Sequence, residues 1–289
     1  MRIGCFKLST NCLVVKLSTV LLTTLCALAA SCTDSLAKAS TDRLHFKSYQ
    51  NNPKRNLKAC DKYIAGLMAS ENGDFGSAIA LLKEAVALDP RCTGAMYTLG
   101  SCYMYDEDYR NSLAINNQAI KVDAKDKDLH YRRAFTYVSL FKYKEAIADL
   151  DKILAMDPKY DGGRALRAKC NAGLGNLKAA LDDYSSMLSD NPRNEEDLLH
   201  RAKLYTQIGD PQKAISDYSA LIKFYPDEYE SYVGRADRYF ALGRFKEAGA
   251  DYNTAILKGT DCYKHCLHQR ELCFKKTGKN NQESSVRRK

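Results

Sequence analysis

The sequence has no tryptophan, few prolines and few glycines, and it contains no long uninterrupted apolar stretch. Its 289 residues include 6 Pro and 16 Gly, while 45% of all residues are hydrophobic. A shortage of helix-breaking residues favours helices, and the apolar share is sufficient for a buried core. The longest apolar run, from Leu17 to Ala30, is shorter than the roughly 20 residues of a membrane-spanning helix.

The motifs that mark common enzymes are also missing. The sequence holds no HExxH pattern, no glycine-rich phosphate loop and no recognisable nucleophile arrangement. We therefore expect a non-catalytic protein without a cofactor.

Positive charge is concentrated at the two ends of the chain. The formal net charge is +9, of which residues 1–58 contribute +7 and residues 261–289 contribute +5, so the middle is slightly acidic. A nucleic-acid-binding fold would carry a basic stripe on its body, so the pattern disfavours nucleic acid as a partner. Basic ends instead suit a chain close to an anionic membrane.

Residues 1–31 have the layout of a signal peptide, with Arg2, Lys7 and Lys16 ahead of an apolar run that ends in small residues. The stretch Ala29-Ala30-Ser31-Cys32 resembles a bacterial lipobox, which implies a lipid on Cys32 and an exported, membrane-anchored protein on the periplasmic or cell-surface side. Cleavage after Ala29 or Ala39, which would release a soluble secreted protein, is the alternative. Residues 32–58 are polar and are interpreted as a tether.

Cysteine is abundant, with 11 residues in the chain. Removal of the signal and lipidation of Cys32 would leave seven, and an odd number argues against a full disulfide framework. Cys102 and Cys170 fall at the same position of the repeat described below, so we expect them to be small buried side chains. Such thiol richness speaks against an oxidising compartment.

A period of 34 residues runs through the middle of the chain. Pro90, Pro158, Pro192 and Pro226 are separated by multiples of this number, and each follows a helix-like stretch. Counting back gives six repeats that start at residues 59, 93, 127, 161, 195 and 229. The eighth and twentieth places of these repeats hold small residues, which allow two helices to approach to about 8–10 Å. The small residues are Gly66, Gly100, Ala134, Ala168, Ala202 and Ala236 at the eighth place and Ala78, Ser112, Ala146, Ala180, Ala214 and Ala248 at the twentieth.

This pattern resembles the tetratricopeptide repeat family. The resemblance implies an all-α fold, a right-handed superhelical solenoid of stacked antiparallel helix pairs over residues 59–260. Residues 261–279 are then a capping helix, slipped by one residue, and residues 280–289 a basic tail expected to be disordered. The family also implies a scaffold that binds a partner protein or peptide through a concave groove lined by the first helix of each repeat.

Charged residues recur inside the last four repeats. The seventh place, where the family usually has Leu, holds arginine, and the twenty-third place holds aspartate. Because both places lie eight residues from the turn, they face each other across an antiparallel hairpin, and we expect structural ion pairs rather than a row of arginines that grips an anionic ligand. The four pairs are Arg133 with Asp149, Arg167 with Asp183, Arg201 with Asp217, and Arg235 with Asp251.

Tyrosine marks the expected groove in the first three repeats. Tyr63, Tyr97 and Tyr131 share the fifth place, about 10 Å apart if neighbouring helices stack, and would form a ladder for a peptide. Packing of these rings between neighbouring helices is the alternative. The remaining residues expected in the groove are Phe135, Arg132, Lys169 and Lys203.

A stretch near the C-terminus, DCYKHCLHQRELC, supports an alternative function. Cys262, Cys266 and Cys273 share one helical stripe, with His265 at its edge. A small ligand or a metal ion is the alternative partner there, although a single straight helix supplies a tetrahedral Zn²⁺ site poorly. We therefore expect no metal.

Overall fold

The computed structural model describes residues 56–160 and 162–278, and all regular elements in these ranges are helices. The expected signal peptide, Cys32, nearly all of the tether and the basic tail lie outside the described residues. The chain divides into two compact units, with the division inside α6 (Lys127–Ser139), after Thr136. The first unit also contains α2 (Leu57–Glu71), α3 (Phe75–Leu88), α4 (Thr93–Tyr105) and α5 (Tyr109–Val122).

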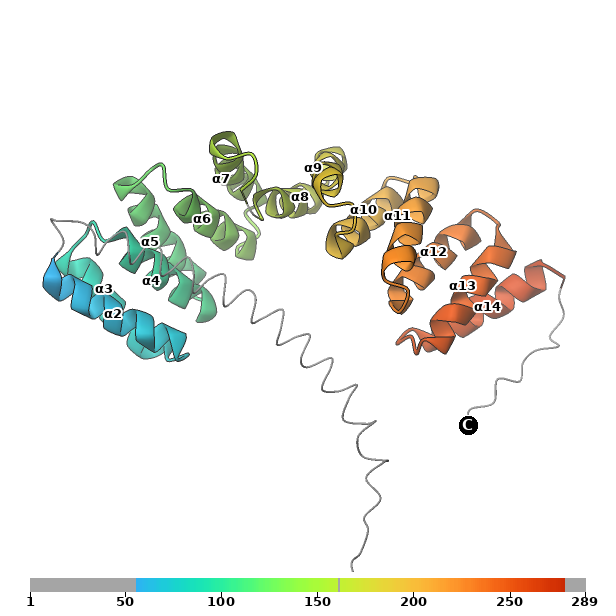
Figure 1. Cartoon of the computed structure of the whole chain (residues 1–289), viewed down its shortest axis with the longest axis horizontal. Coiled ribbons are helices and arrows are strands. Elements are labelled where there is room, and N and C mark those ends of the chain that lie inside the picture. Colours follow the sequence, from blue (N-terminus) through green and yellow to red (C-terminus); the bar gives the residue numbers. More distant parts are fainter. Residues whose placement is uncertain (1–55, 161, 279–289) are drawn as a thin grey trace, which may run out of the picture. The chain divides into compact units, whose positions relative to one another are not determined.

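The second unit holds the remaining helices, which follow one another along the chain (Figure 1). They are α7 (Tyr143–Met156), α8 (Gly163–Gly173), α9 (Leu177–Asp190), α10 (Glu195–Gln207), α11 (Pro211–Phe224), α12 (Tyr229–Ala241), α13 (Phe245–Leu257) and α14 (Tyr263–Lys276). No described helix is long and apolar enough to span a membrane.

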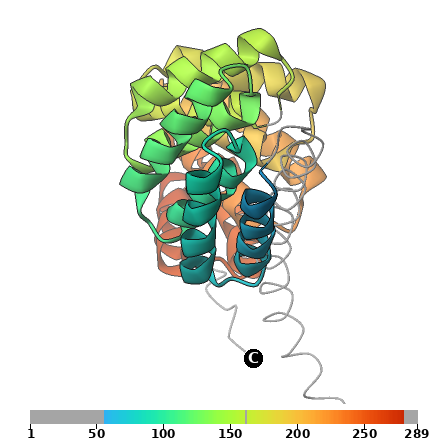
Figure 2. The same cartoon turned by 90° about the vertical axis from the view of Figure 1, so that its left-hand side faces the viewer.

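Each expected repeat corresponds to one helix pair, here called a hairpin, of a first and a second helix. In the first unit α2 packs on α3 and α4 on α5, and Figure 2 shows these pairs side by side. In the second unit α8 packs on α9, α10 on α11 and α12 on α13, while each second helix also packs on the next first helix. The expected all-α stack of antiparallel helix pairs is confirmed.

The turn inside each hairpin contains a residue with a left-handed backbone at the fifteenth place. Four of the six are glycines, with φ between 71° and 80°. The other two are Glu107 and Phe141, each with φ of 57°. This backbone conformation is unfavourable for any residue that has a Cβ. The turn geometry is therefore kept even where the sequence does not supply glycine.

Aspartates close to helix ends act as caps, as their positions in the sequence indicate. Asp74, Asp108 and Asp210 each accept a hydrogen bond from the backbone N–H three residues later, at the start of a second helix. Beyond the second helices, Asp89 and Asp157 accept the N–H two residues later, in a turn that includes the repeat proline. The first kind of hydrogen bond marks where a second helix begins. The second kind marks the turn in which it has ended.

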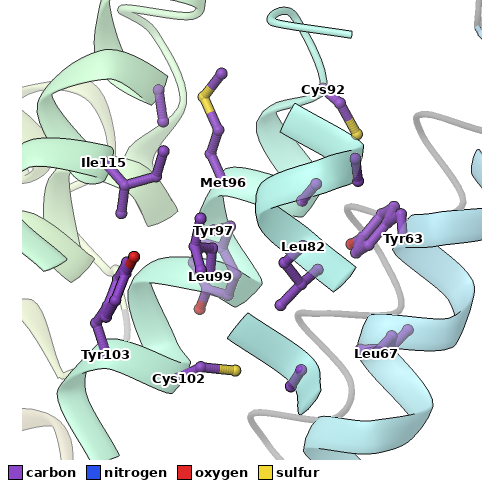
Figure 3. Packing of buried hydrophobic residues seen from close by; sticks show 14 of the residues in the cluster. Tyr63, Leu67, Leu82, Cys92, Met96, Tyr97, Leu99, Cys102, Tyr103 and Ile115 are labelled. Carbon is purple, nitrogen blue, oxygen red and sulfur yellow. The ribbon is translucent and has the colours of Figure 1, made fainter. Parts of the chain in front are cut away.

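The small residues of the repeat lie where first and second helices touch. In Figure 3, Leu82 of α3 lies between Tyr63 of α2 and the side chains of α4. An added Cβ at Gly66 would come within 2.7 Å of Leu82 Cγ, and Ala78 of α3 is fully buried. Close approach of the two backbones therefore depends on the eighth and twentieth places.

The second repeat departs from the pattern, and its unusual residues form a buried polar cluster. Ser112 donates to the Gly100 carbonyl at 3.0 Å and contacts the Thr136 hydroxyl at 3.2 Å. Asn116 donates to the same hydroxyl, but its Oδ1 has no hydrogen-bond partner in the described residues. Hydrogen bonds here add to the apolar contacts of the repeat.

Glu107→Gly should stabilise the first unit by about 1 kcal/mol, because glycine takes a positive φ without the steric cost borne by other residues. The reverse change, Gly209→Ala, should destabilise the second unit by a similar amount, since Gly209 has φ of 77° and no neighbour within 4 Å of an added Cβ. Urea unfolding of both variants measures the effect. Shifts of the same sign would contradict this explanation of the turns.

Candidate functional site

Three of the four expected arginine–aspartate pairs form within single hairpins of the second unit. Arg201 donates from Nε and Nη2 to the two carboxylate oxygens of Asp217, at 2.9 and 2.8 Å. Arg167 with Asp183 and Arg235 with Asp251 repeat this two-bond geometry at 2.6–3.0 Å. Hydrogen bonding to Asp217 raises the pKa of Arg201 further, so its guanidinium stays charged.

Each of these arginines also reaches the hairpin before its own, a contact that the sequence analysis missed. The third nitrogen, Nη1, donates to the twenty-fifth place of the preceding repeat: Asp151 from Arg167, Ser185 from Arg201 and Ser219 from Arg235. We call this chain of contacts the arginine relay. Its signal in the sequence is the short polar residues at that place: Asn117, Asp151, Ser185, Ser219 and Asn253.

Arg133, in the third repeat, shares part of this geometry. Its Nη1 donates to Asn117 Oδ1 at 2.8 Å, which matches the backward contact of the relay. The expected partner Asp149 is almost fully buried in the other unit, so the Arg133–Asp149 pair stays a prediction.

Burial argues that the relay is part of the scaffold and not a ligand site. Asp183, Asp217 and Asp251 are 5–7% exposed, and the arginine side chains that bind them are 20–27% exposed. Most of each guanidinium's donors are used inside the protein, so little is left for an anionic ligand.

The prediction that a ladder of tyrosines lines the groove is wrong for Tyr63 and Tyr97. Tyr63 is fully buried, and its ring lies against α4 at Gly94, where an added Cβ would come within 2.8 Å of the hydroxyl oxygen. Tyr97 is 6% exposed, and the Arg132 guanidinium lies over its ring at 4.3 Å from the centroid. These rings pack between neighbouring first helices, and the position of the Tyr63 ring is possible because Gly94 has no side chain.

The other members of the expected groove in the first unit lie on α6. Tyr131 is half-buried, whereas Phe135 is 45% exposed. The expected aromatic surface is therefore reduced to these two residues.

In the second unit the first helices α8, α10 and α12 carry two parallel rows of side chains. Ala165, Leu199 and Val233 share the fifth place and are half-buried, while Lys169, Lys203 and Asp237 share the ninth. Within each helix the two places are four residues apart and so lie on one face. We call this surface the first-helix face.

Ionic contacts link neighbouring helices on the first-helix face. Lys169 of α8 donates to Glu196 of α10 at 2.7 Å, and this bond lowers the pKa of Glu196. His200 lies 3.5 Å from the same carboxylate and stacks on Tyr184, and burial lowers the pKa of its imidazole. Lys203 is exposed, and no carboxylate in the described residues forms an ion pair with it.

The Cys/His stripe lies on α14 and does not converge on a metal-binding cluster within the described residues. Cys266 and Cys273 are buried in the core formed with Tyr252 of α13, and burial raises the pKa of both thiols. Cys262 is exposed, and His265 lies 3.5 Å from the Asp237 carboxylate. The stripe is thus mainly an apolar contact between α14 and α13.

Comparison with known families agrees with this architecture. Models described as tetratricopeptide repeat match residues 69–134, 128–160 and 199–261, which together make up more than half of the chain. The chain belongs to the tetratricopeptide repeat family. No curated protein matches the chain at a significant level.

Solved structures of other tetratricopeptide repeat proteins share the fold. YrrB, described as having an unusual peptide-binding site, is 17% identical, with a TM-score of 0.57 over 66% of this chain and 97% of its own. PilW, a type IV pilus biogenesis factor, is 18% identical, with a TM-score of 0.58 over 73% and 99%. A repeat protein from Parabacteroides merdae is 19% identical, with a TM-score of 0.53 over 87% and 98%. At these identities the likeness concerns the fold alone.

Arg201→Leu should destabilise the second unit by about 3 kcal/mol, because it leaves the buried Asp217 carboxylate without its partner. The double variant Arg201→Leu with Asp217→Leu should recover most of that loss, since no unpaired charge remains buried. Chemical unfolding of the two single variants and the double variant gives the coupling energy. Equal losses for Arg201→Leu and the double variant would contradict a paired role.

Proposed function

We propose that this chain is a non-catalytic scaffold that binds a peptide segment of a partner protein along the first-helix face. The family supports binding of proteins in general, and the two parallel rows on α8, α10 and α12 carry the more specific proposal. A half-buried apolar row beside a charged row suits an amphipathic segment, whose apolar side chains lie on Leu199 and Val233.

The charges on this face indicate the chemistry of the segment. Lys203 offers three donors without a carboxylate partner in the described residues, and Lys169 lies one repeat away on the same row. Asp237, by contrast, already accepts the Tyr252 hydroxyl at 2.5 Å. The bound segment therefore carries an acidic residue that reaches Lys203, with apolar residues beside it.

A photo-crosslinking amino acid at position 203 tests this proposal. We expect it to capture one defined peptide of a partner protein, identified by mass spectrometry of the cross-linked fragment. The same amino acid in place of Lys178, which is exposed on the second helix α9, is the matched control and should not capture that peptide. Capture of the same peptide from both positions, or from neither, would reject the first-helix face as the binding surface.

We also propose that the scaffold is exported and tethered to a membrane through a lipid on Cys32. The support is the signal-like residues 1–31 and the lipobox-like stretch that ends at Cys32. The mature protein should then fractionate with membranes and carry a diacylglyceryl mass on its N-terminal peptide, and Cys32→Ala should remove both. A mature N-terminus at residue 30 or 40 without lipid would show plain cleavage instead.

A further inference from the structure

The turns inside the six hairpins share one geometry but present two kinds of surface. In every turn the N–H of the sixteenth place donates to the carbonyl of the eleventh place at 2.8–2.9 Å. The fourteenth place is polar in the turns of the first unit, with Asn72 and Asp106, and apolar in those of the second. Because both kinds of residue occur in the same turn geometry, folding does not require the apolar ones. These apolar residues, here called the apolar tips, are Leu140, Leu174, Ile208 and Leu242.

Phe141, next to the first apolar tip, is the most exposed large apolar side chain in the described residues. It is 78% exposed, and its ring meets Tyr143 edge-on with 6.3 Å between the ring centroids. Its backbone has the left-handed conformation that glycine adopts in the next three turns. A phenylalanine at this place leaves a large ring in water and carries a steric cost that glycine avoids. Such a residue indicates a contact with something outside the chain.

Exposed lysines accompany the apolar tips. Over places thirteen to nineteen, the second unit has six basic and three acidic residues, whereas the first unit has one basic and five acidic ones. Of the acidic residues in the second unit, Asp210 already binds Lys213 at 3.0 Å. Glu247 likewise binds Arg244 at 2.9 Å. The four remaining basic residues are exposed and form no ion pair within the described residues, and they are Lys142, Lys144, Lys178 and Lys246.

These turns lie at one edge of the second unit, here called the turn edge. Consecutive helices pack on one another and are joined by short connections, so neighbours run antiparallel. The second helices α7, α9, α11 and α13 therefore all begin at the same edge. The last first helix, α14, ends there, and its final residues Lys275 and Lys276 are exposed and basic. Apolar tips and positive charge thus share one edge of the unit.

An anionic lipid surface is the partner that fits the turn edge. Each apolar tip belongs to a separate turn, and polar or charged residues follow it in the sequence. A stable protein interface needs about 1,200–2,000 Å² of well-matched surface with an apolar core. The boundary between lipid headgroups and acyl chains instead accepts single apolar side chains, and Lys or Arg beside them binds the lipid phosphates. The four lysines without an ion pair supply this complementary charge.

We propose that the turn edge of the second unit lies against an anionic membrane. The ring of Phe141 reaches below the lipid headgroups, and the same four lysines bind lipid phosphates. Ile208 and Leu242, which are 45% and 43% exposed, add apolar contacts at the same edge. This contact is additional to the lipid proposed on Cys32 and uses a surface other than the first-helix face. It therefore stands if either of those proposals fails.

The chain has no tryptophan, so Phe141→Trp places a single fluorescent reporter at the turn edge. With vesicles of equal parts phosphatidylglycerol and phosphatidylcholine, we expect the emission of the full chain to shift to shorter wavelength, because the indole leaves water. Leu257→Trp is the matched control, since Leu257 is 66% exposed at the opposite end of α13, and its emission should stay unchanged. The readout depends on the surroundings of the indole and not on how the chain reaches the vesicle. No shift at position 141, or equal shifts at both positions, would overturn the proposal.

The lysines are tested in the same reporter chain. Lys144→Gln, Lys178→Gln and Lys246→Gln together should remove most of the shift. Vesicles of phosphatidylcholine alone, or added salt, should have the same effect, because the attraction to lipid phosphates is electrostatic. The Tm should stay unchanged, since none of these lysines forms an ion pair within the described residues. An unchanged shift in the lysine variant would overturn the proposal, and so would a shift without vesicles that grows with protein concentration, which would identify a second copy of the chain as the occupant.

Discussion

In the second unit, one arginine guanidinium per hairpin bonds the two helices of that hairpin to each other. The same group also bonds to the hairpin before it. Two of its donor nitrogens bind the aspartate of the facing helix, and the third binds a short polar side chain of the preceding second helix. From α8 to α13 this interaction adds hydrogen bonds to the apolar packing between neighbouring hairpins. Hydrogen bonds from a planar guanidinium impose a fixed geometry that apolar contacts do not.

The two units reach stability by different means. In the first and second repeats the relay places hold Ala65 with Leu81 and Leu99 with Ile115, and the core there is apolar and includes Tyr63 and Tyr97. In the second unit the corresponding places are charged, and the first-helix face is also charged. Tyr63 and Tyr97, which the sequence suggested for binding, are thus used for packing. The candidate binding surface lies in the unit that contains the ion pairs.

The fold followed from the sequence because small residues and turn residues recur every 34 residues. Small residues allow two helices to approach closely, and turn residues allow a left-handed backbone. The arginine–aspartate pairs followed for the same reason, since equal distances from a turn put two residues at one height. The burial of Tyr63 did not follow, because it depends on Gly94, which belongs to the next repeat and to a different place of the motif. The backward contacts of the relay did not follow either, because they join different places of different repeats, whereas the 34-residue pattern relates residues at the same place.

Hydrogen–deuterium exchange of Asp217→Asn tests most directly whether the relay joins neighbouring hairpins. Asp217 lies on α11 and holds Arg201 of α10, which in turn contacts Ser185 of α9. The relay predicts faster exchange in α9 as well as in α10 and α11, because the arginine loses the carboxylate that orients it toward Ser185. Faster exchange confined to α10 and α11 would show that the pair stabilises its own hairpin alone and would contradict this account.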